Sequence, residues 1–107
     1  MSEYPKAVKR QLRELAGLAY ERAMAKELGK LAERVAAWQA GSVSVWELDE
    51  AIHKYHQGPA RELYSRYRGG DEGMLVVGAL HDGVLTDSEV PPAAKPYIAQ
   101  LTALLHL

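Results

Sequence analysis

Residues 6–39 read KAVKRQLRELAGLAYERAMAKELGKLAERVAAWQ, a stretch dominated by residues that strongly favour the α-helix. Pro5 precedes the stretch and suits the first turn of a helix, where its missing N–H has no intrahelical partner to lose. Gly17 and Gly29 each weaken a helix by up to about 1 kcal/mol but do not end it. The pattern therefore predicts one long helix that ends at Gly41.

Two apolar stripes lie on different faces of this predicted helix. At about 100° per residue their centres differ by roughly 140°, so the two halves of the helix need different neighbours. We expect the second and richer stripe to pack on the chain's own second, third and fourth helices; it comprises Tyr20, Met24, Leu28, Leu31, Val35 and Trp38. The first stripe is left for the last helix or for a second copy of the chain. Of these two, we expect an antiparallel homodimer through Val8, Leu12, Leu15 and Ala19.

The clearest local signal in the sequence is a capping box at residues 44–47, with Ser44 as the N-cap and Glu47 at N3. Val43 and Leu48 stand at the two positions of the matching hydrophobic staple. A second helix is therefore expected to begin at Val45. Gly58-Pro59 breaks the chain, because glycine ends helices and proline opens them.

A third helix is predicted from Pro59 to about Tyr67, followed by Gly69-Gly70. Asp71 is the expected N-cap of a fourth helix, about Glu72–Asp82, with Gly83 just past its end. The alternative for Met74–Leu80 is a strand of a hairpin that turns at Asp82-Gly83. A helix is favoured, because a lone two-stranded hairpin is only marginally stable.

A final helix is predicted from Pro92 to about Leu105, with Pro96 near its first turns, where a proline bends or delays a helix. The whole chain, residues 1–107, thus reads as one all-α domain of about five helices. One long N-terminal helix is expected to pack against four shorter ones.

Composition narrows the classes of function. The net charge is −1, which provides no strong field toward nucleic acid or an anionic membrane. Cysteine is absent, which excludes disulfide frameworks, thiolate zinc sites and cysteine nucleophiles. The longest apolar run has about seven residues, against the roughly 20 needed to span a bilayer. The N-terminus also lacks the apolar core of a signal peptide, so a cytoplasmic protein without a membrane partner is expected.

The densest polar cluster of the chain lies on the predicted second helix. Glu50 and His53 have the Glu-x-x-His spacing of di-metal sites in helical bundles, which directs both ligands toward one ion. Such sites need two of these motifs and two further Glu, and the chain has only one motif. The metal hypothesis therefore names Asp49, Glu50, His53 and His56, and the competing interpretation is a solvated helix face, which is favoured.

A second constellation surrounds the Gly-Pro break. If the third helix turned back at this break, His56 would approach its N-terminus, where N–H groups and basic side chains bind anions. The candidate ligand-binding residues are His56, Arg61, Glu62 and Tyr64. A network of ion pairs that braces the corner is the favoured alternative. A general-base role for His53 or His56 is open, but no nucleophile stands near them in sequence, so no catalytic residue is assigned.

Basic residues crowd the start of the first helix, at Lys6, Lys9, Arg10 and Arg13. Two helices around a short turn are also typical of helix-turn-helix proteins. The predicted second helix is acidic, however, and the total charge is wrong for a dedicated nucleic-acid binder. Nucleic-acid binding is therefore the least favoured alternative.

Four short segments form a pattern: W-x-x-G at 38–41, E-L at 47–48, I-H-x-Y-H-x-G at 52–58 and R-E-L-Y at 61–64. This pattern resembles one found in small bacterial proteins of unknown function and covers about a quarter of the chain. The resemblance implies a bacterial origin and no particular activity, cofactor or partner. We therefore expect a non-catalytic interaction module without a cofactor that self-associates or binds another protein. The alternative is a metal- or ligand-binding protein, possibly an enzyme, that uses the cluster on the second helix.

Overall fold

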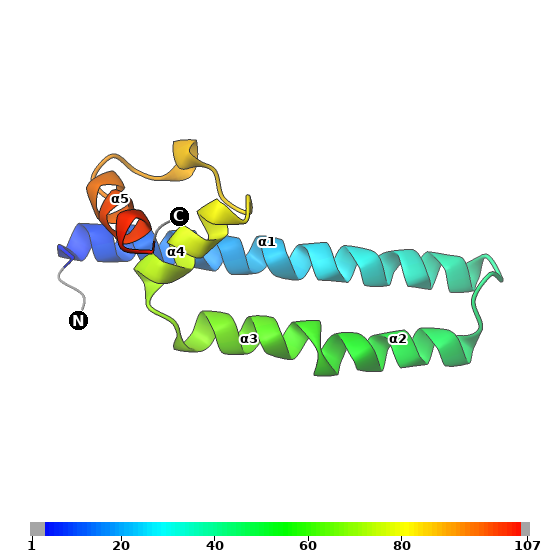
Figure 1. Ribbon diagram of the computed structural model, residues 1–107. Coiled ribbons are helices and arrows are strands. Elements are labelled where there is room, and N and C mark those ends of the chain that lie inside the picture. Colours follow the sequence, from blue (N-terminus) through cyan, green and yellow to red (C-terminus); the bar gives the residue numbers. More distant parts are fainter. Residues whose placement is uncertain (1–3, 106–107) are drawn as a thin grey trace.

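A computed structural model describes residues 4–105, and these residues form an all-α structure, as the sequence predicts. Figure 1 shows a long first helix with two helices in a row along one side and two more helices over its N-terminal half. The elements in chain order are α1 (Lys6–Gln39), α2 (Val45–Gln57), α3 (Pro59–Gly69), α4 (Glu72–His81), a 3₁₀ turn η1 (Asp87–Glu89) and α5 (Lys95–Leu104).

The long helix α1 ends where its chemistry predicts. Gly41 adopts a φ of 82°, a left-handed conformation that glycine reaches without the steric cost of a Cβ. Its N–H donates to Trp38 O at 3.0 Å, and the next N–H, of Ser42, donates to Ala37 O at 2.9 Å. These two bonds form a Schellman motif, which satisfies carbonyls that the helix leaves without partners.

The predicted capping box at the start of α2 is confirmed. Glu47 N donates to Ser44 Oγ at 3.1 Å, and Ser44 N donates to Glu47 Oε1 at 3.0 Å. The hydrogen bonds from the backbone and side chain of Ser44 lower the pKa of Glu47. Leu48 at N4 is buried and Val43 before the cap is half-buried, as a staple requires.

At Gly58-Pro59 the chain kinks instead of turning a corner. Gly58 is both the C-cap of α2 and the N-cap of α3: its N–H donates to Lys54 O, and its carbonyl accepts from Glu62 N. Pro59 interrupts the ladder because it has no N–H to donate. Figure 1 shows α3 continuing the course of α2 beside α1. The tight corner on which the ligand-site hypothesis depended is therefore absent at this junction, and so is the helix-turn-helix arrangement of the least favoured alternative.

Met74–Leu80 is helical, and the hairpin alternative is wrong. Asp71 Oδ1 accepts a hydrogen bond from Met74 N at 3.1 Å and caps α4, as predicted. Gly83 follows the helix with a φ of 78°. The N–H of Val84 then donates to Ala79 O at 2.8 Å, which closes a second Schellman motif.

The last helix begins three residues later than predicted, at Lys95 instead of Pro92. Residues 92–94 form a turn in which Ala94 N donates to Pro91 O at 3.0 Å. Pro96 lies in the first turn of α5, where its missing N–H leaves no intrahelical bond unmade. Proline thus sets the start of this helix.

The main core lies between the N-terminal half of α1 and the segment from α4 to α5. Val76 and Val77 of α4, Leu85 and Val90 of the connecting loop, and Ile98 of α5 are all buried there. The α1 side of this core contains Val8, Leu12, Leu15 and Ala19. The prediction that these four residues bind a second copy is wrong, because the chain's own later elements cover them.

The second stripe of α1 packs on α2 and α3, as predicted, whereas α4 packs on the first stripe. The rings of Tyr20 and Tyr67 stack with centroids 5.0 Å apart and fasten α1 to α3. Burial here is shallow: Leu48 is the buried side chain of α2 and Leu63 that of α3. The molecule is therefore a layer of α1 beside α2–α3, with α4 and α5 covering one end of it.

Candidate functional site

The residues of the predicted metal site lie exposed along α2. His53 Nε2 and Asp49 Oδ2 are 3.6 Å apart, and both side chains are more than 60% exposed. Within residues 4–105, no group of three or more His, Asp or Glu side chains is placed to hold a metal ion. The structure therefore brings two of the four predicted ligands together and leaves Glu50 and His56 outside the pair.

The residues of the predicted ligand site do not converge. Glu62 lines a groove with residues of α1 and with Asp82, whereas Tyr64 is exposed with Arg68 over its ring at 5.1 Å. Two positions apart on one helix means about 200° around its axis, so these side chains cannot reach one small ligand. His56 and Arg61 are exposed on α2 and α3, and α3 continues the course of α2 instead of folding back onto it.

The basic residues at the start of α1 remain at the surface. Lys6, Lys9, Arg10 and Arg13 border one shallow depression. Arg10 lies 3.9 Å from Glu14, and Arg13 lies 3.8 Å from Glu72. Ion pairs this long and this exposed stabilise little, so the charge of this surface stays available to a partner.

Two histidines lie outside these clusters in the sequence. His81 is exposed in the last turn of α4, where a cation complements the helix dipole. His106 lies outside the described residues.

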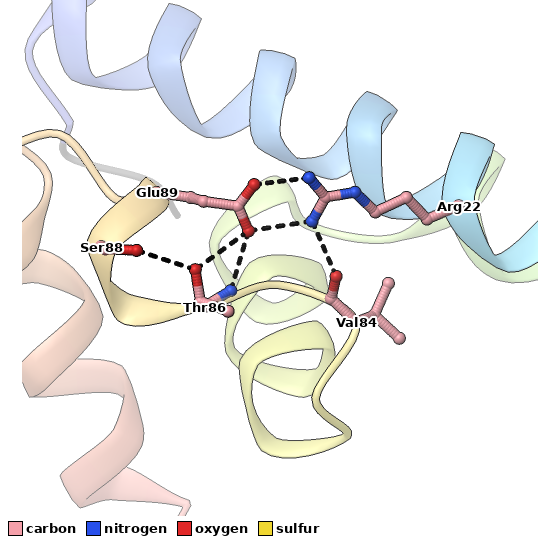
Figure 2. Close-up of polar contacts among 5 residues, drawn as sticks. All are labelled: Arg22, Val84, Thr86, Ser88 and Glu89. Atoms are coloured by element: carbon pink, nitrogen blue, oxygen red, sulfur yellow. Dashed lines mark hydrogen bonds and ion pairs between the residues drawn. The ribbon is translucent and has the colours of Figure 1, made fainter.

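The strongest polar contact of the described structure joins α1 to the loop after α4 (Figure 2). Arg22 Nη1 donates to Glu89 Oε1 and to Val84 O, both at 2.9 Å, while Nη2 binds the other oxygen of Glu89. Thr86 N also donates to Glu89 Oε1 at 2.9 Å. Hydrogen bonds from Arg22 and from the Thr86 backbone lower the pKa of Glu89 to about 2.

Sequence reasoning missed this clamp because Arg22 and Glu89 are 67 residues apart. A usable signal was present in Thr86-Asp-Ser-Glu89, which has the spacing of a capping box and forms one. Every acceptor of the clamp belongs to the chain itself. We therefore assign it the structural role of holding the loop against α1.

The most distinctive surface is an apolar face of the layer formed by α1, α2 and α3. We call it the open face and define it by Leu28, Val45, Ile52 and Tyr64, which are between 44% and 53% exposed. Successive residues of a helix are about 100° apart around its axis. By this measure, each of the four side chains is rotated roughly 60–80° around its own helix from the side that packs on the neighbouring helix. Because α1 runs antiparallel to α2 and α3, all four are displaced toward the same side of the layer.

Two grooves lie on the side of the layer opposite the open face. One contains Arg34 of α1 with Glu47 and Ala51 of α2. The other contains Ala23 of α1, Glu62 and Arg66 of α3, and Val84 after α4. Around their helices, these residues are rotated away from the packed side in the direction opposite to that of Leu28 and Ile52. The open face therefore lies on the side of the layer away from α4 and α5.

No helix within residues 4–105 is both long enough and apolar enough to cross a membrane. Comparison of the chain with protein-family models, curated proteins and solved structures found no match. The resemblance to small bacterial proteins therefore stays an expectation, and the open face is the feature on which a function can be argued.

Proposed function

We propose that this protein is a non-catalytic interaction module that self-associates, with the open face of one copy packed on the open face of another. The observation that carries the proposal is an apolar face that no segment of residues 4–105 covers, on a layer two helices wide and one helix thick. An amphipathic layer of this kind reaches a stable state by burying its face against another layer. Two such layers face to face make a four-helix bundle.

The surface area of the chain supports this proposal. Its accessible surface is 7325 Å². A compact monomer of 11.8 kDa is expected to expose about 5,900 Å², so this chain exposes roughly a quarter more. The excess exceeds the ~800 Å² that each partner buries in an interface of standard size. A second copy on the open face would bury an area of the right order.

The shape of the chain points the same way. The radius of gyration is 17.4 Å, with extents of 53 × 25 × 25 Å. A compact domain of 107 residues has a radius of about 13 Å. The difference comes from the part of the layer that extends beyond α4 and α5 (Figure 1). Among residues 4–105, no other element covers either broad face of this part.

Two matched variants on α2 test the proposal. Ile52→Glu places a charge on the open face, whereas Trp46→Glu places one on the opposite side of the layer, where Trp46 lines the groove that contains Arg34. Trp46 is the more exposed of the two, at 80%. If exposed apolar area alone drove association, Trp46→Glu would have the larger effect. The proposal expects the reverse.

Light scattering during size-exclusion chromatography measures the molar mass of each variant directly. The wild type and Trp46→Glu are expected at twice the 11.8 kDa of one chain, and Ile52→Glu at 11.8 kDa. Circular dichroism should show the same helical signal for all three proteins, because neither substitution reaches the buried core. Dimers of equal strength in both variants would contradict the open face as the interface.

A further inference from the structure

We infer that the start of α1 is a binding surface for an acidic helix of another protein. We call this surface the basic flank and define it by Lys6, Lys9, Arg10 and Arg13. The charge of these residues and their place on the helix both point to such a partner. The basic flank is separate from the open face, so this inference does not depend on the proposed self-association.

The four bases share one side of α1. Their spacing is i, i+3, i+4 and i+7, which is the spacing of residues that line one face of a helix. All four residues are exposed, and the side chains of Arg10 and Arg13 are 70% and 65% exposed. Val8 and Leu12, which alternate with them in the sequence, are buried in the main core. The basic flank is therefore a continuous stripe of positive charge about 10 Å long.

The basic flank continues the side of α1 that packs on α3. Arg13 precedes Tyr20 by seven residues, nearly two turns, and therefore lies on the same side of the helix. Tyr20 stacks on Tyr67 of α3, and α3 ends two residues later, at Gly69. Figure 1 shows α1 running on past this end. At 1.5 Å per residue, Arg13 lies about 7 Å beyond the end of α3, and Lys6 lies about 18 Å beyond it.

Within residues 4–105, no other element lies over the basic flank. The residues that line the shallow depression along it all belong to α1. Two carboxylates stand at its edges: Glu14 is 3.9 Å from Arg10, and Glu72 is 3.8 Å from Arg13. The two lysines of the flank have no ion-pair partner within 4 Å in this part of the chain. Most of the positive charge of the flank is therefore left without compensation.

This placement of charge does not stabilise the chain by itself. The first turns of a helix carry positive partial charge, so that carboxylates are favourable there and bases are unfavourable. α2, α3 and α4 each have a Glu in the first turn, and α5 has a single base there. The first turn of α1 has no carboxylate and no side-chain cap. An anionic partner beside the flank would supply the compensation that the chain lacks.

The distribution of charge favours an acidic helix over a continuous polyanion. Outside the basic flank the chain has nine bases and fourteen carboxylates, a net charge of −5. Because Glu14 and Glu72 border the flank itself, a run of phosphates laid along it would also meet carboxylates. A helix can instead carry carboxylates only at i, i+3, i+4 and i+7, a stripe of the same spacing as the flank. This side of α1 already packs on helices farther along, so a helix in line with α3 would find the same geometry, with axes about 10 Å apart.

Binding of a defined peptide tests the inference. The probe is a fluorescein-labelled, alanine-based helical peptide with Glu at i, i+3, i+4 and i+7, and the control peptide has Gln at the same positions. Lys9→Gln combined with Arg13→Gln removes two bases from the flank. Lys54→Gln combined with Arg61→Gln is the matched control variant, because it removes two exposed bases of α2 and α3 and changes the net charge equally. Fluorescence anisotropy at low ionic strength measures the Kd of each protein for each peptide.

The wild type and the control variant are expected to bind the Glu peptide equally. The flank variant should bind it about fivefold more weakly, because two exposed ion pairs are lost. Its Tm should not fall, since bases at the start of a helix oppose the helix dipole, and its molar mass should equal that of the wild type. A loss of peptide binding is thereby distinguished from a loss of folding and from a loss of self-association.

Three results would overturn the inference. The first is equal binding of the Glu and Gln peptides, or no binding of the Glu peptide by the wild type at about 1 mM protein. The second is an equal Kd for the flank variant and the control variant. The third is tighter binding of a DNA duplex or of phosphatidylserine vesicles than of the Glu peptide, lost in the flank variant, which would assign the flank to a polyanion.

Discussion

Replacing Leu12 by Ala tests whether the first stripe of α1 belongs to the chain's own core. The Leu12 side chain is 0% exposed and shares a core cluster with Val76 of α4 and Ile98 of α5. Truncating a buried Leu to Ala removes its transfer free energy and leaves a cavity, for about 2–5 kcal/mol. We expect about 3 kcal/mol here, because helices on both sides of the site resist collapse into the cavity.

The expected loss is large enough to measure without difficulty. At about 2.1 cal/mol/K of unfolding entropy per residue, 3 kcal/mol lowers the Tm of a 107-residue chain by roughly 13 °C. Thermal unfolding followed by circular dichroism at equal protein concentrations measures this shift. Leu104→Ala is the matched control, since its side chain is 73% exposed and its loss should cost less than about 0.5 kcal/mol. If Leu12→Ala instead kept the Tm and halved the mass, this stripe would be the dimer interface and the core assignment would be refuted.

Four other outcomes are expected. Ser44→Ala should cost about 1 kcal/mol through loss of the N-cap, and an unchanged Tm would contradict the capping box. Gly41→Ala should cost about 1 kcal/mol because the φ of 82° strains any residue with a Cβ, while Gly29→Ala, in open helical space, should not lower the Tm. Because the pKa of Glu89 is lowered to about 2, the wild type should exceed Glu89→Gln in stability above about pH 4.5 and lose this advantage as the pH falls toward 2; a constant difference across that range would rule out the clamp. Protein purified without an affinity tag should contain no stoichiometric iron, manganese or zinc by elemental analysis, and a loaded protein would revive the metal hypothesis for α2.

The ends of the helices could be predicted from the sequence because each is determined within a few residues. The capping box at Ser44, the cap at Asp71 and the glycine at Gly83 each satisfy backbone groups through side chains or conformations nearby in the chain. Their partners are at most five positions away. The start of α5 was the exception, because two prolines in residues 92–96 offered two possible first turns.

The faces of α1 could be separated from the sequence, but their partners could not be assigned. Helical periodicity alone places the two stripes at different angles. Which element covers which stripe depends on the path of the chain at Gly58-Pro59, a dipeptide that is compatible with a corner or a kink. Because the chain kinks there, α3 stays beside the second stripe, and α4 becomes the neighbour of the first.

In the candidate site, too, local contacts could be predicted from the sequence, whereas contacts between distant segments could not. The capping-box spacing of Thr86 and Glu89 is local, but the approach of Arg22 to Glu89 depends on how two segments 67 residues apart pack together. The i,i+4 neighbourhood of Asp49 and His53 was predictable from the helix alone and is observed. The open face was not predicted, because Leu28 belongs to a stripe that was expected to be covered by the second, third and fourth helices.

The molar mass of the wild-type chain, measured by light scattering at high micromolar concentration and after serial dilution, tests the central claim most directly. Self-association through the open face predicts twice 11.8 kDa at the highest concentration and a fall toward 11.8 kDa on dilution. A mass of 11.8 kDa at every concentration would contradict it, and the extended layer of α1, α2 and α3 would then have to be stable as a monomer.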